Sequence, residues 1–450
     1  MDPALVGLTV LAIVAGLVRL DSKSLWLDEA VSVTHARLGL SGLWGVVSGS
    51  DPNMGLYYVA LHVWVDLFGY GQTSVRLLSV LLGALAIPAI LMLGTRIGAR
   101  MTGLAAALLL ALAPFFVHYE QTVRSYALLV TLACLSSYFF LGGVERPSRG
   151  NWVGYVLTSV LAVYAHYLAA LVLLVQALTL LALKRRAAFT RWWLTAGLSV
   201  VVLCSPEVVF AERRGLVPIS WIPKPSFTNV VHLPADLAGG AVLAGVLIVL
   251  AGYGVARLAA EGRRWQAWFL AAWCVIPVFI DLVVSLLGRP LFLSYYLIFV
   301  LPALLLLAAA GLVRLPGRPL KAAALALILA LSLVGLSEWY GKGSAEDYRA
   351  ATRFLLSHAR AGDAVFYDPS YAAIPFTYYE SLAHSPGPPV LGALPGPASG
   401  GRPRRLWLVF RDFDRPRAQR ITVERSLADG YMMVGYEPKV AGVTVILYRH

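Results

Sequence analysis

Residues 5–30 read LVGLTVLAIVAGLVRLDSKSLWLDEA, an apolar run that is followed by two adjacent acids, Asp28 and Glu29. Acids at a membrane edge are tolerated only where they face water, so a carboxylate pair pinned there by Trp26 indicates a site. The alternative is that both are ordinary solvated loop charges. No small-residue cleavage site follows the apolar run, which predicts a retained span rather than a removed signal peptide.

The composition places the chain among membrane proteins. Of its 450 residues, 59% are hydrophobic and 14% are charged, and the mean hydropathy of +0.72 exceeds that of soluble domains of this size. The apolar block 152–183 is broken near His166 and is either two short helices or one long kinked helix. The apolar runs predict a polytopic α-helical protein with about eleven spans, near residues 4–20, 74–97, 102–117, 123–143, 152–166, 168–183, 192–210, 236–257, 266–287, 292–313 and 319–339.

Basic residues fall in alternate loops, and this pattern predicts the orientation. The positive-inside rule puts these loops in the cytoplasm. The N-terminus is then cytoplasmic, and the C-terminal segment lies on the outer side of the cell (inner) membrane. The net charge of +13 then reflects topology and some attraction to anionic lipid, and it does not indicate nucleic-acid binding. The basic clusters are Arg96/Arg100, Arg146/Arg149, Lys184/Arg185/Arg186/Arg191, Arg257/Arg263/Arg264 and Arg314/Arg318/Lys321.

Polar residues concentrate in the predicted outer loops, of which the first spans about residues 21–73. Within it, residues 36–47 suit a helix lying in the membrane interface, and residues 56–68 suit a second short helix. A long first outer loop with helices of its own is unusual for a transporter. Beyond the acid pair, the binding candidates in this loop are Asp51, Asn53 and Tyr57.

Two further outer turns carry candidate binding residues. An arginine at the start of a span, Arg124, suits a phosphate at the membrane surface because its guanidinium fork matches phosphate oxygens. The alternative for Arg124 is a snorkelling interfacial anchor, and the alternative for His166 is a hydrogen-bonded structural histidine. Asp281, inside a predicted span, is a functional candidate without an evident partner. The other candidates in these turns are His118, Glu120, Tyr126 and Tyr167.

The order of these short motifs resembles that of a known family. Trp-x-Asp-Glu follows the first span, a Leu-Tyr-Tyr helix closes the first loop, and a Gln-x-x-Arg-x-Tyr turn comes next. A Tyr-x-His-Tyr break and a Tyr-Leu-(x)4-Pro span, Tyr296 to Pro302, complete the series. Over about residues 1–310 the chain resembles the polytopic GT-C glycosyltransferases of the protein O-mannosyltransferase-like and lipid A aminoarabinose transferase-like group.

The resemblance implies a glycosyltransferase that moves a sugar from a polyprenyl-phosphate-linked donor to an acceptor on the outer face of the membrane. It implies that Asp28 lies in the catalytic cavity, that Glu29 supports it and that Arg124 helps to hold the donor phosphate. Many relatives carry Arg-Tyr where this chain has Tyr295 and Tyr296, and Arg289 is the expected substitute. Relatives also commonly have His-Pro-Pro before the Leu-Tyr-Tyr helix, where this chain reads Asp-Pro-Asn-Met-Gly.

The chemistry of such a transfer points to the same roles. It needs a base for the acceptor proton and stabilisation of the departing phosphate. A single carboxylate serves as base when attack inverts the anomeric carbon, and Asp28 is the candidate. Arg124 is the phosphate candidate, with Arg289 or Arg213/Arg214 as helpers. No cofactor is certain, although ligand type makes a divalent metal conceivable on Asp28, Glu29, Asp51 or His166.

The C-terminal segment, about residues 341–450, differs from the 1–340 membrane domain because charge rises and spans stop. Alternating helices and strands predict a small extracytoplasmic α/β domain that shapes the acceptor path or covers the cavity, with a folding appendage as the alternative. Glu346 is expected to be exposed here, and its substitution is expected to be silent. The predicted elements are helix 345–361, strand 363–368, helix 370–381, strand 405–411, helix 415–429 and strands 431–437 and 443–449.

A transporter or flippase of a lipid-linked sugar is the alternative function. Flippases usually show internal repeats and polar residues near the bilayer midplane. In this sequence the candidate polar groups crowd the outer ends of the spans and no repeat is visible, which favours the transferase. The sugar, the polyprenol and the acceptor, whether lipid, glycan or protein, are left open by the sequence.

Overall fold

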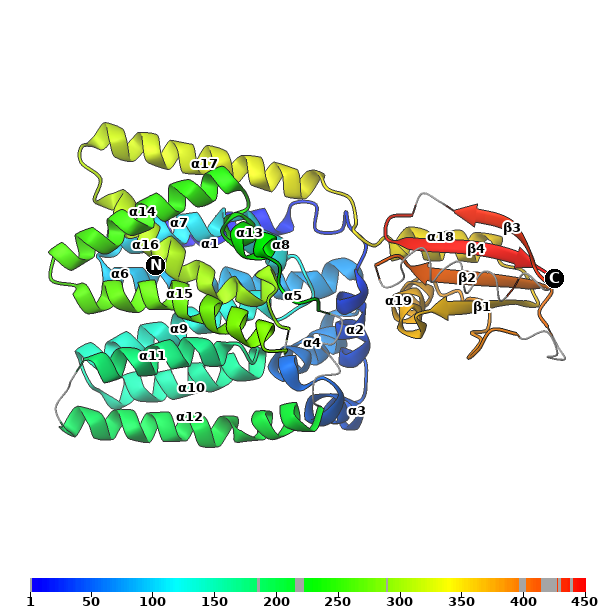
Figure 1. The fold of residues 1–450 in the computed structure, drawn as a ribbon, viewed down its shortest axis with the longest axis horizontal. Coiled ribbons are helices and arrows are strands. Elements are labelled where there is room, and N and C mark those ends of the chain that lie inside the picture. The colour runs from blue at the N-terminus through cyan, green and yellow to red at the C-terminus, as the bar shows by residue number, and fades with distance from the viewer. Residues whose placement is uncertain are drawn as a thin grey trace. The chain divides into compact units, whose positions relative to one another are not determined.

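The structure is a computed structural model that describes residues 2–183, 187–214, 222–288, 290–395, 402–413, 427, 430–437 and 440–450. The chain divides into two compact units (Figure 1). The helical unit comprises residues 1–18, 38–68 and 75–341, and the sheet unit comprises residues 19–37, 69–74 and 342–450. The acid pair, Asp28 and Glu29, therefore belongs to the sheet unit.

The helical unit has the predicted membrane character. Among the described residues, seven helices are long and apolar enough to cross a membrane, or eight if the bent pair α7 and α8 counts as one span. Shorter apolar helices such as α1 and α11 account for other predicted spans, so the number eleven stays a prediction. Besides helices named below, the unit contains α1 (Pro3–Leu17), α4 (Gly55–Phe68), α5 (Gln72–Ala84), α6 (Ala86–Ile97), α7 (Arg100–Ala111), α8 (Pro114–Glu120), α10 (Arg149–Ala165), α11 (Ala169–Ala182), α13 (Phe227–Ala238), α14 (Ala241–Ala260) and α15 (Arg264–Leu286).

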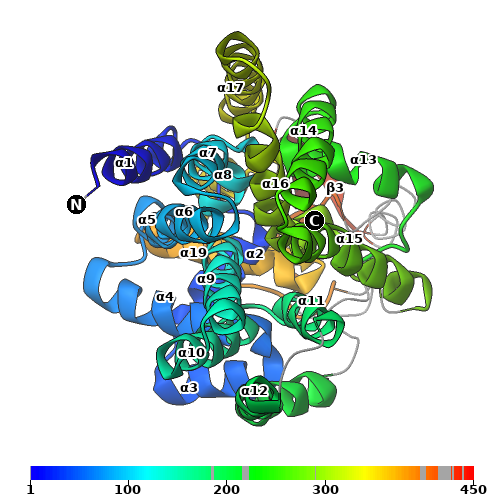
Figure 2. The same ribbon diagram turned by 90° about the vertical axis from the view of Figure 1, so that its left-hand side faces the viewer.

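Burial separates central helices from peripheral ones. In α9 (Tyr126–Glu145), 83% of the most apolar stretch of the helix is buried. The same share is buried in the segment formed by the 3-10 turn Ser294–Val300 and the α16 helix (Leu301–Val313) that follows it. In α12 (Ala187–Arg214) and α17 (Arg318–Gly341) only 22% is buried, and both helices lie at the edge of the bundle in Figure 2. The apolar side chains exposed on these peripheral helices suit contact with lipid.

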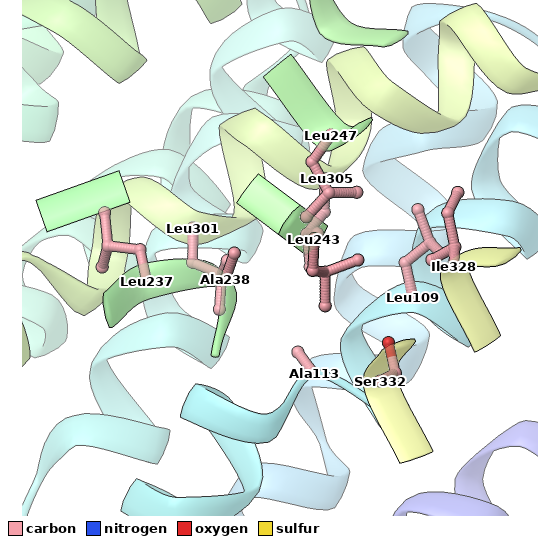
Figure 3. Close-up of a pocket in the computed structure, with 10 residues that line it drawn as sticks. All are labelled: Leu109, Ala113, Leu237, Ala238, Leu243, Leu247, Leu301, Leu305, Ile328 and Ser332. Atoms are coloured by element: carbon pink, nitrogen blue, oxygen red, sulfur yellow. The ribbon is translucent and has the colours of Figure 1, made fainter. Parts of the chain in front are cut away.

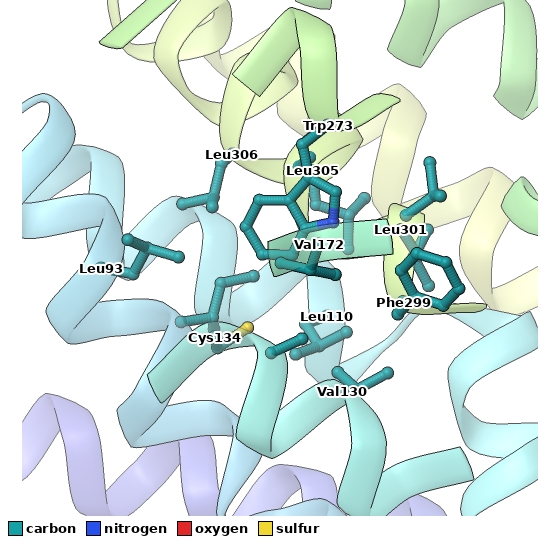
Figure 4. Packing of buried hydrophobic residues seen from close by; sticks show 14 of the residues in the cluster. Leu93, Leu110, Val130, Cys134, Val172, Trp273, Phe299, Leu301, Leu305 and Leu306 are labelled. Carbon is teal, nitrogen blue, oxygen red and sulfur yellow. The ribbon is translucent and has the colours of Figure 1, made fainter. Parts of the chain in front are cut away.

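The central core is built from large apolar side chains. Trp273 of α15 and Phe299 of the 3-10 turn are fully buried and lie among Leu301, Leu305 and Leu306 of the following segment (Figure 4). These residues form one contiguous cluster with side chains of α6, α7, α9 and α11. The core therefore holds the start of α9, which carries Arg124 immediately before it, on a rigid support.

Two breaks in the bundle have local causes. The α7 and α8 helices are bent by 62° where Pro114 begins α8, because a proline is favoured in the first turn of a helix but not in its interior. At His166 the backbone is extended (φ −168°, ψ 128°), and it separates α10 from α11. The apolar block 152–183 is thus two short helices rather than one kinked helix.

The helix expected over residues 36–47 begins later than predicted. After the end of α2 (Leu27–Ala36), Gly39 is the N-cap of α3 (Leu40–Gly45), which continues directly into a π-helical turn, Val46–Ser50. The helix therefore covers residues 40–50, and its start is displaced by the glycine at position 39. The second short helix of this loop is confirmed as α4, where His62 and Asp66 lie 3.7 Å apart on successive turns.

The sheet unit contains a four-stranded sheet of order β1-β2-β4-β3, flanked by the helices α18 (Tyr348–His358) and α19 (Ala373–Leu382). The strands are β1 (Asp363–Asp368), β2 (Arg405–Arg411), β3 (Met432–Glu437) and β4 (Val443–Arg449). β1 runs parallel to β2, with Asp363 opposite Arg405, and the other pairs are antiparallel. These elements match the prediction closely, whereas the predicted helix 415–429 lies almost entirely outside the described residues.

The contact between α14 and α16 depends on two glycines. A Cβ atom at Gly254 would overlap the Leu307 carbonyl oxygen, and one at Gly311 would overlap the Leu250 carbonyl oxygen. Small residues at such contacts let helix backbones approach closely in a membrane, where the hydrophobic effect between helices is absent. The two backbones are therefore in direct contact.

Gly311→Ala is expected to lower the unfolding free energy in detergent by about 1–3 kcal/mol, because the added methyl group must push the two helices apart. Gly252→Ala, on α14 but with no atom within 4 Å of the added Cβ, is the matched control and should be neutral or slightly stabilising. Thermal unfolding of both variants provides the measurement. Equal melting temperatures for the two variants would contradict the close contact.

Candidate functional site

The acid pair lies in the first turn of α2, inside the sheet unit. Glu29 is fully buried, and its Oε2 accepts a hydrogen bond from the Trp26 backbone N–H at 3.2 Å. Asp28 is only partly buried. The first N–H groups of a helix lack partners within the helix, and negative charge is favoured at that end. Glu29 therefore caps its own helix, and Asp28 is the more accessible carboxylate of the two.

The start of α2 is also held from a distant part of the sequence. Glu346 Oε2 accepts a hydrogen bond from the Leu27 backbone N–H at 3.1 Å, and Glu346 Oε1 accepts one from Arg411 of β2. Glu346 is only 3% exposed, so the expectation that it is exposed is wrong. Sequence reasoning missed it because its partners lie far away along the chain. Burial raises the pKa of the Glu346 carboxyl, and the Arg411 guanidinium opposes that shift.

Tyr379 of α19 fixes the residues just before the acid pair. Its hydroxyl accepts a hydrogen bond from the Leu25 backbone N–H at 2.7 Å and donates one to Gln72 Oε1 at 2.7 Å. The Ser24 hydroxyl lies 3.1 Å from the same oxygen. Burial raises the pKa of Tyr379, whose hydroxyl thus stays protonated and able to donate. Segment 24–29 is accordingly positioned by α19 and by the chain around Glu346.

In the helical unit, Arg124 lies immediately before the first turn of α9, with Ser125 as the N-cap residue. Arg124 is 8% exposed, and its guanidinium carbon lies 5.9 Å from the centre of the Tyr126 ring. Arg124 is also near enough to His166 to interact with it electrostatically. An anion at this point would be attracted both by the charge of the buried guanidinium and by the partial positive charge of the helix N-terminus.

His166 presents a buried donor beside this arginine. Its Nδ1 accepts a hydrogen bond from the Leu168 backbone N–H at 3.3 Å, which assigns the remaining proton of a neutral ring to Nε2. Nε2 is buried and has no hydrogen-bond partner among the described residues. The ring centre lies 5.4 Å from that of Tyr296 and 6.1 Å from that of Tyr126. The structure thus brings Arg124, Tyr126, His166 and Tyr296 together.

The next residue, Tyr167, connects this group to the first loop. Its backbone N–H donates to Asn53 Oδ1 at 3.1 Å. The Tyr58 hydroxyl donates to Asp51 Oδ2 at 2.5 Å, in the turn that leads into α4. Asp51 and Asn53 therefore belong to one polar segment beside the break at His166.

The remaining predicted residues lie elsewhere. The Tyr57 and Ser79 hydroxyls are hydrogen-bonded at 2.6 Å, an interaction between α4 and α5. His118 stacks on Trp339, with ring centres 3.6 Å apart. Glu120 packs against Gly83 so closely that a Cβ there would meet its carboxylate at 2.7 Å. Arg289 lies outside the described residues, as does the side chain of Arg214, and Arg213 is exposed.

Three buried acids of the helical unit stand apart because their carboxylate oxygens make no hydrogen bond within the described part of the chain: Glu120, Glu207 and Asp281. Glu207 was missed in the sequence, although an acid inside the apolar span 192–210 is itself a signal. Across the described residues, no group of three or more His, Cys, Asp or Glu side chains is arranged to hold a metal ion.

A small apolar pocket lies at the other side of the core, between α7, α13, α14, α16 and α17 (Figure 3). Its lining is leucine, alanine and isoleucine, with Ser332 as the single polar side chain. Its volume of about 10 Å³ corresponds to one water molecule. It is a packing gap in this conformation and contains none of the candidate residues.

Part of the chain is similar in sequence to a known family. Residues 50–210 match the family described as dolichyl-phosphate-mannose-protein mannosyltransferase. No curated protein matches the chain in sequence.

Several solved structures resemble the chain. The ArnT protein of Cupriavidus metallidurans bound to undecaprenyl phosphate is 16% identical with a TM-score of 0.63, over 98% of this chain and 97% of its own. The mycobacterial arabinofuranosyltransferase AftD is 17% identical with a TM-score of 0.56, over 98% of this chain and 40% of its own. The Archaeoglobus fulgidus oligosaccharyltransferase tethered to an acceptor peptide is 12% identical with a TM-score of 0.53, over 86% of this chain and 64% of its own. These likenesses confirm the predicted fold class.

Glu346→Ala is expected to loosen segment 21–37 and to lower the unfolding free energy by about 3 kcal/mol, since it removes both the acceptor of the Leu27 N–H and the carboxylate to which Arg411 donates. Glu346→Gln retains an oxygen that can accept the Leu27 N–H, so the unfolding free energy should fall by about half as much as in Glu346→Ala. Arg353→Ala, an exposed change on α18, is the control.

Hydrogen exchange of peptides covering residues 21–37 in the full-length protein tests this anchor directly. Faster exchange in Glu346→Ala, but not in Arg353→Ala, is the expected result. Unchanged exchange in Glu346→Ala would contradict the anchoring role.

Proposed function

We propose that this chain, a multi-pass membrane protein with the fold of the GT-C glycosyltransferases, moves a sugar from a polyprenyl-phosphate-linked donor to an acceptor hydroxyl on the outer face of the membrane. The observation that carries the proposal is that Arg124, just before α9, lies near His166, whose Nε2 has no hydrogen-bond partner within the described part of the chain. This grouping suits a phosphate, and the fold is one in which a solved relative is bound to undecaprenyl phosphate.

The phosphate end of the reaction is assigned to Arg124. When the bond between the anomeric carbon and the phosphate oxygen breaks, negative charge grows on the phosphate. A buried guanidinium and the Nε2–H of His166 both donate hydrogen bonds to an anion, and low surrounding polarity strengthens these interactions. The α9 N-terminus adds a partial positive charge at the same point.

The base is assigned to Asp28. The acceptor hydroxyl oxygen attacks the anomeric carbon, Asp28 takes the hydroxyl proton, and polyprenyl phosphate leaves with the electrons of the broken bond. The partial exposure of Asp28 leaves it open to an acceptor, whereas Glu29 is occupied with the Trp26 N–H. One carboxylate acting as base in a single displacement gives inversion at the anomeric carbon.

Asp28→Asn is expected to reduce release of polyprenyl phosphate by about 10²–10⁴-fold, because the amide cannot accept the proton, while donor binding is retained. The measurement is release from a panel of polyprenyl-phosphate sugars by purified protein, with natural membrane extract as the acceptor. Asp66→Asn, whose side chain is 67% exposed, is the control. Normal release by Asp28→Asn would remove Asp28 as the base, and tight donor binding without release by the native protein would favour a flippase.

Arg124→Ala is expected to weaken binding of the donor and of sugar-free polyprenyl phosphate alike, by about 10–100-fold, because both ligands share the phosphate. The exposed Lys342→Ala serves as the charge-matched control. Equilibrium binding of both ligands to each variant provides the measurement. Unchanged affinity in Arg124→Ala would contradict the phosphate role.

A further inference from the structure

Glu207 is a buried carboxylate that has no role in the reaction proposed above. It lies near the C-terminal end of α12, within a helix apolar enough to cross a membrane, and is 1% exposed. Within the described residues neither carboxylate oxygen has a well-formed hydrogen bond, and the nearby donor is the Tyr167 side chain. Burying a carboxylate without hydrogen bonds costs several kcal/mol, and acids within membrane spans are functional candidates for that reason.

The surroundings of Glu207 are polar on one side. The Tyr167 side chain lies near enough to interact with the Glu207 carboxylate. A Cβ added at Gly55, at the start of α4, would lie 3.7 Å from Glu207 Oε1. Asn53, two residues before Gly55, accepts the Tyr167 backbone N–H. The carboxylate therefore lies where α12, the first loop and the break between α10 and α11 meet.

The break also connects Glu207 to the phosphate group. His166 lies beside Arg124, and the next residue, Tyr167, lies beside Glu207. His166 and Tyr167 are consecutive residues, so the group beside Arg124 and the group beside Glu207 are joined by one peptide unit. In a ligand whose phosphate contacts Arg124 and His166, the sugar is one bond away from that contact, which makes Tyr167 and Glu207 the candidates for contact with the sugar.

We propose that Glu207, with Tyr167 beside it, binds the hydroxyl groups of the donor sugar. An ionised carboxylate has two acceptor oxygens and no donor, so it is matched by the paired hydroxyl donors of a sugar ring. An aromatic hydroxyl beside it adds a donor and an apolar face. This assignment rests on the proposed function, because it takes the sugar to be attached to the phosphate that Arg124 holds.

The other two buried acids do not share these neighbours. Glu120 packs against Gly16 of α1 and Gly83 of α5. Asp281 lies within α15. Of the three acids, Glu207 is the one that lies near Tyr167, the residue adjoining His166.

The test compares two ligands in two carboxylate variants of the same helix. Glu207→Gln is expected to bind polyprenyl-phosphate sugar about 10–100-fold more weakly than the native protein does, the loss expected for hydrogen bonds to a charged group. Its affinity for sugar-free polyprenyl phosphate is expected to be unchanged. Glu212→Gln, an exposed change further along α12, should alter neither affinity.

Equal affinities of Glu207→Gln and native protein for the sugar-bearing ligand would overturn the assignment, and so would an equal loss for both ligands. If Glu207→Gln fails to fold, Tyr167→Phe provides the same comparison, with a smaller selective loss expected and an unchanged sugar affinity contradicting the proposal. In a kinetic assay, the weaker binding of the sugar by Glu207→Gln should appear as a raised KM for the donor. Failure of the proposed function itself would be distinguishable, because the native protein would then release no polyprenyl phosphate from any donor.

Discussion

The hydrogen bond from the Leu27 backbone N–H to Glu346 sets the position of the acid pair. It satisfies an N–H group at the start of α2 that the helix itself cannot satisfy. Because Arg411 of β2 holds the other oxygen of Glu346, the start of α2 is coupled to the sheet more than 300 residues later in the sequence. The C-terminal segment is therefore part of the support of Asp28, a more specific role than that of a folding appendage.

In the helical unit the equivalent constraint is the extended backbone at His166. It ends α10 and orients two consecutive side chains, one beside Arg124 and one beside Glu207. The buried helices α9 and α16 belong to the apolar cluster that packs next to these residues. If the proposed phosphate and sugar contacts are made by these adjacent residues, they provide a physical basis for recognising a lipid-phosphate sugar as one molecule.

Much of the fold is predictable from local sequence. Apolar runs located the membrane helices, and alternating patterns located β1, β2 and β4 almost to the residue, because burial and periodicity act over short distances. Motif order singled out Arg124 and His166 separately, and their proximity to one another comes from the fold. The roles of Glu346 and Glu207 were not predictable, since each depends on contacts between segments distant in sequence. The helix expected over residues 36–47 begins at Leu40, after the Gly39 N-cap, and continues as a π-helical turn to Ser50, so only its bounds differ from the prediction.

The proposed reaction is a single displacement with Asp28 as the base. Proton NMR can establish the anomeric configuration of the transferred sugar and compare it with that of the donor. We expect a glycosylated product of inverted configuration, formed together with one equivalent of polyprenyl phosphate. A product of retained configuration would contradict it, because retention requires two displacements and a second nucleophile.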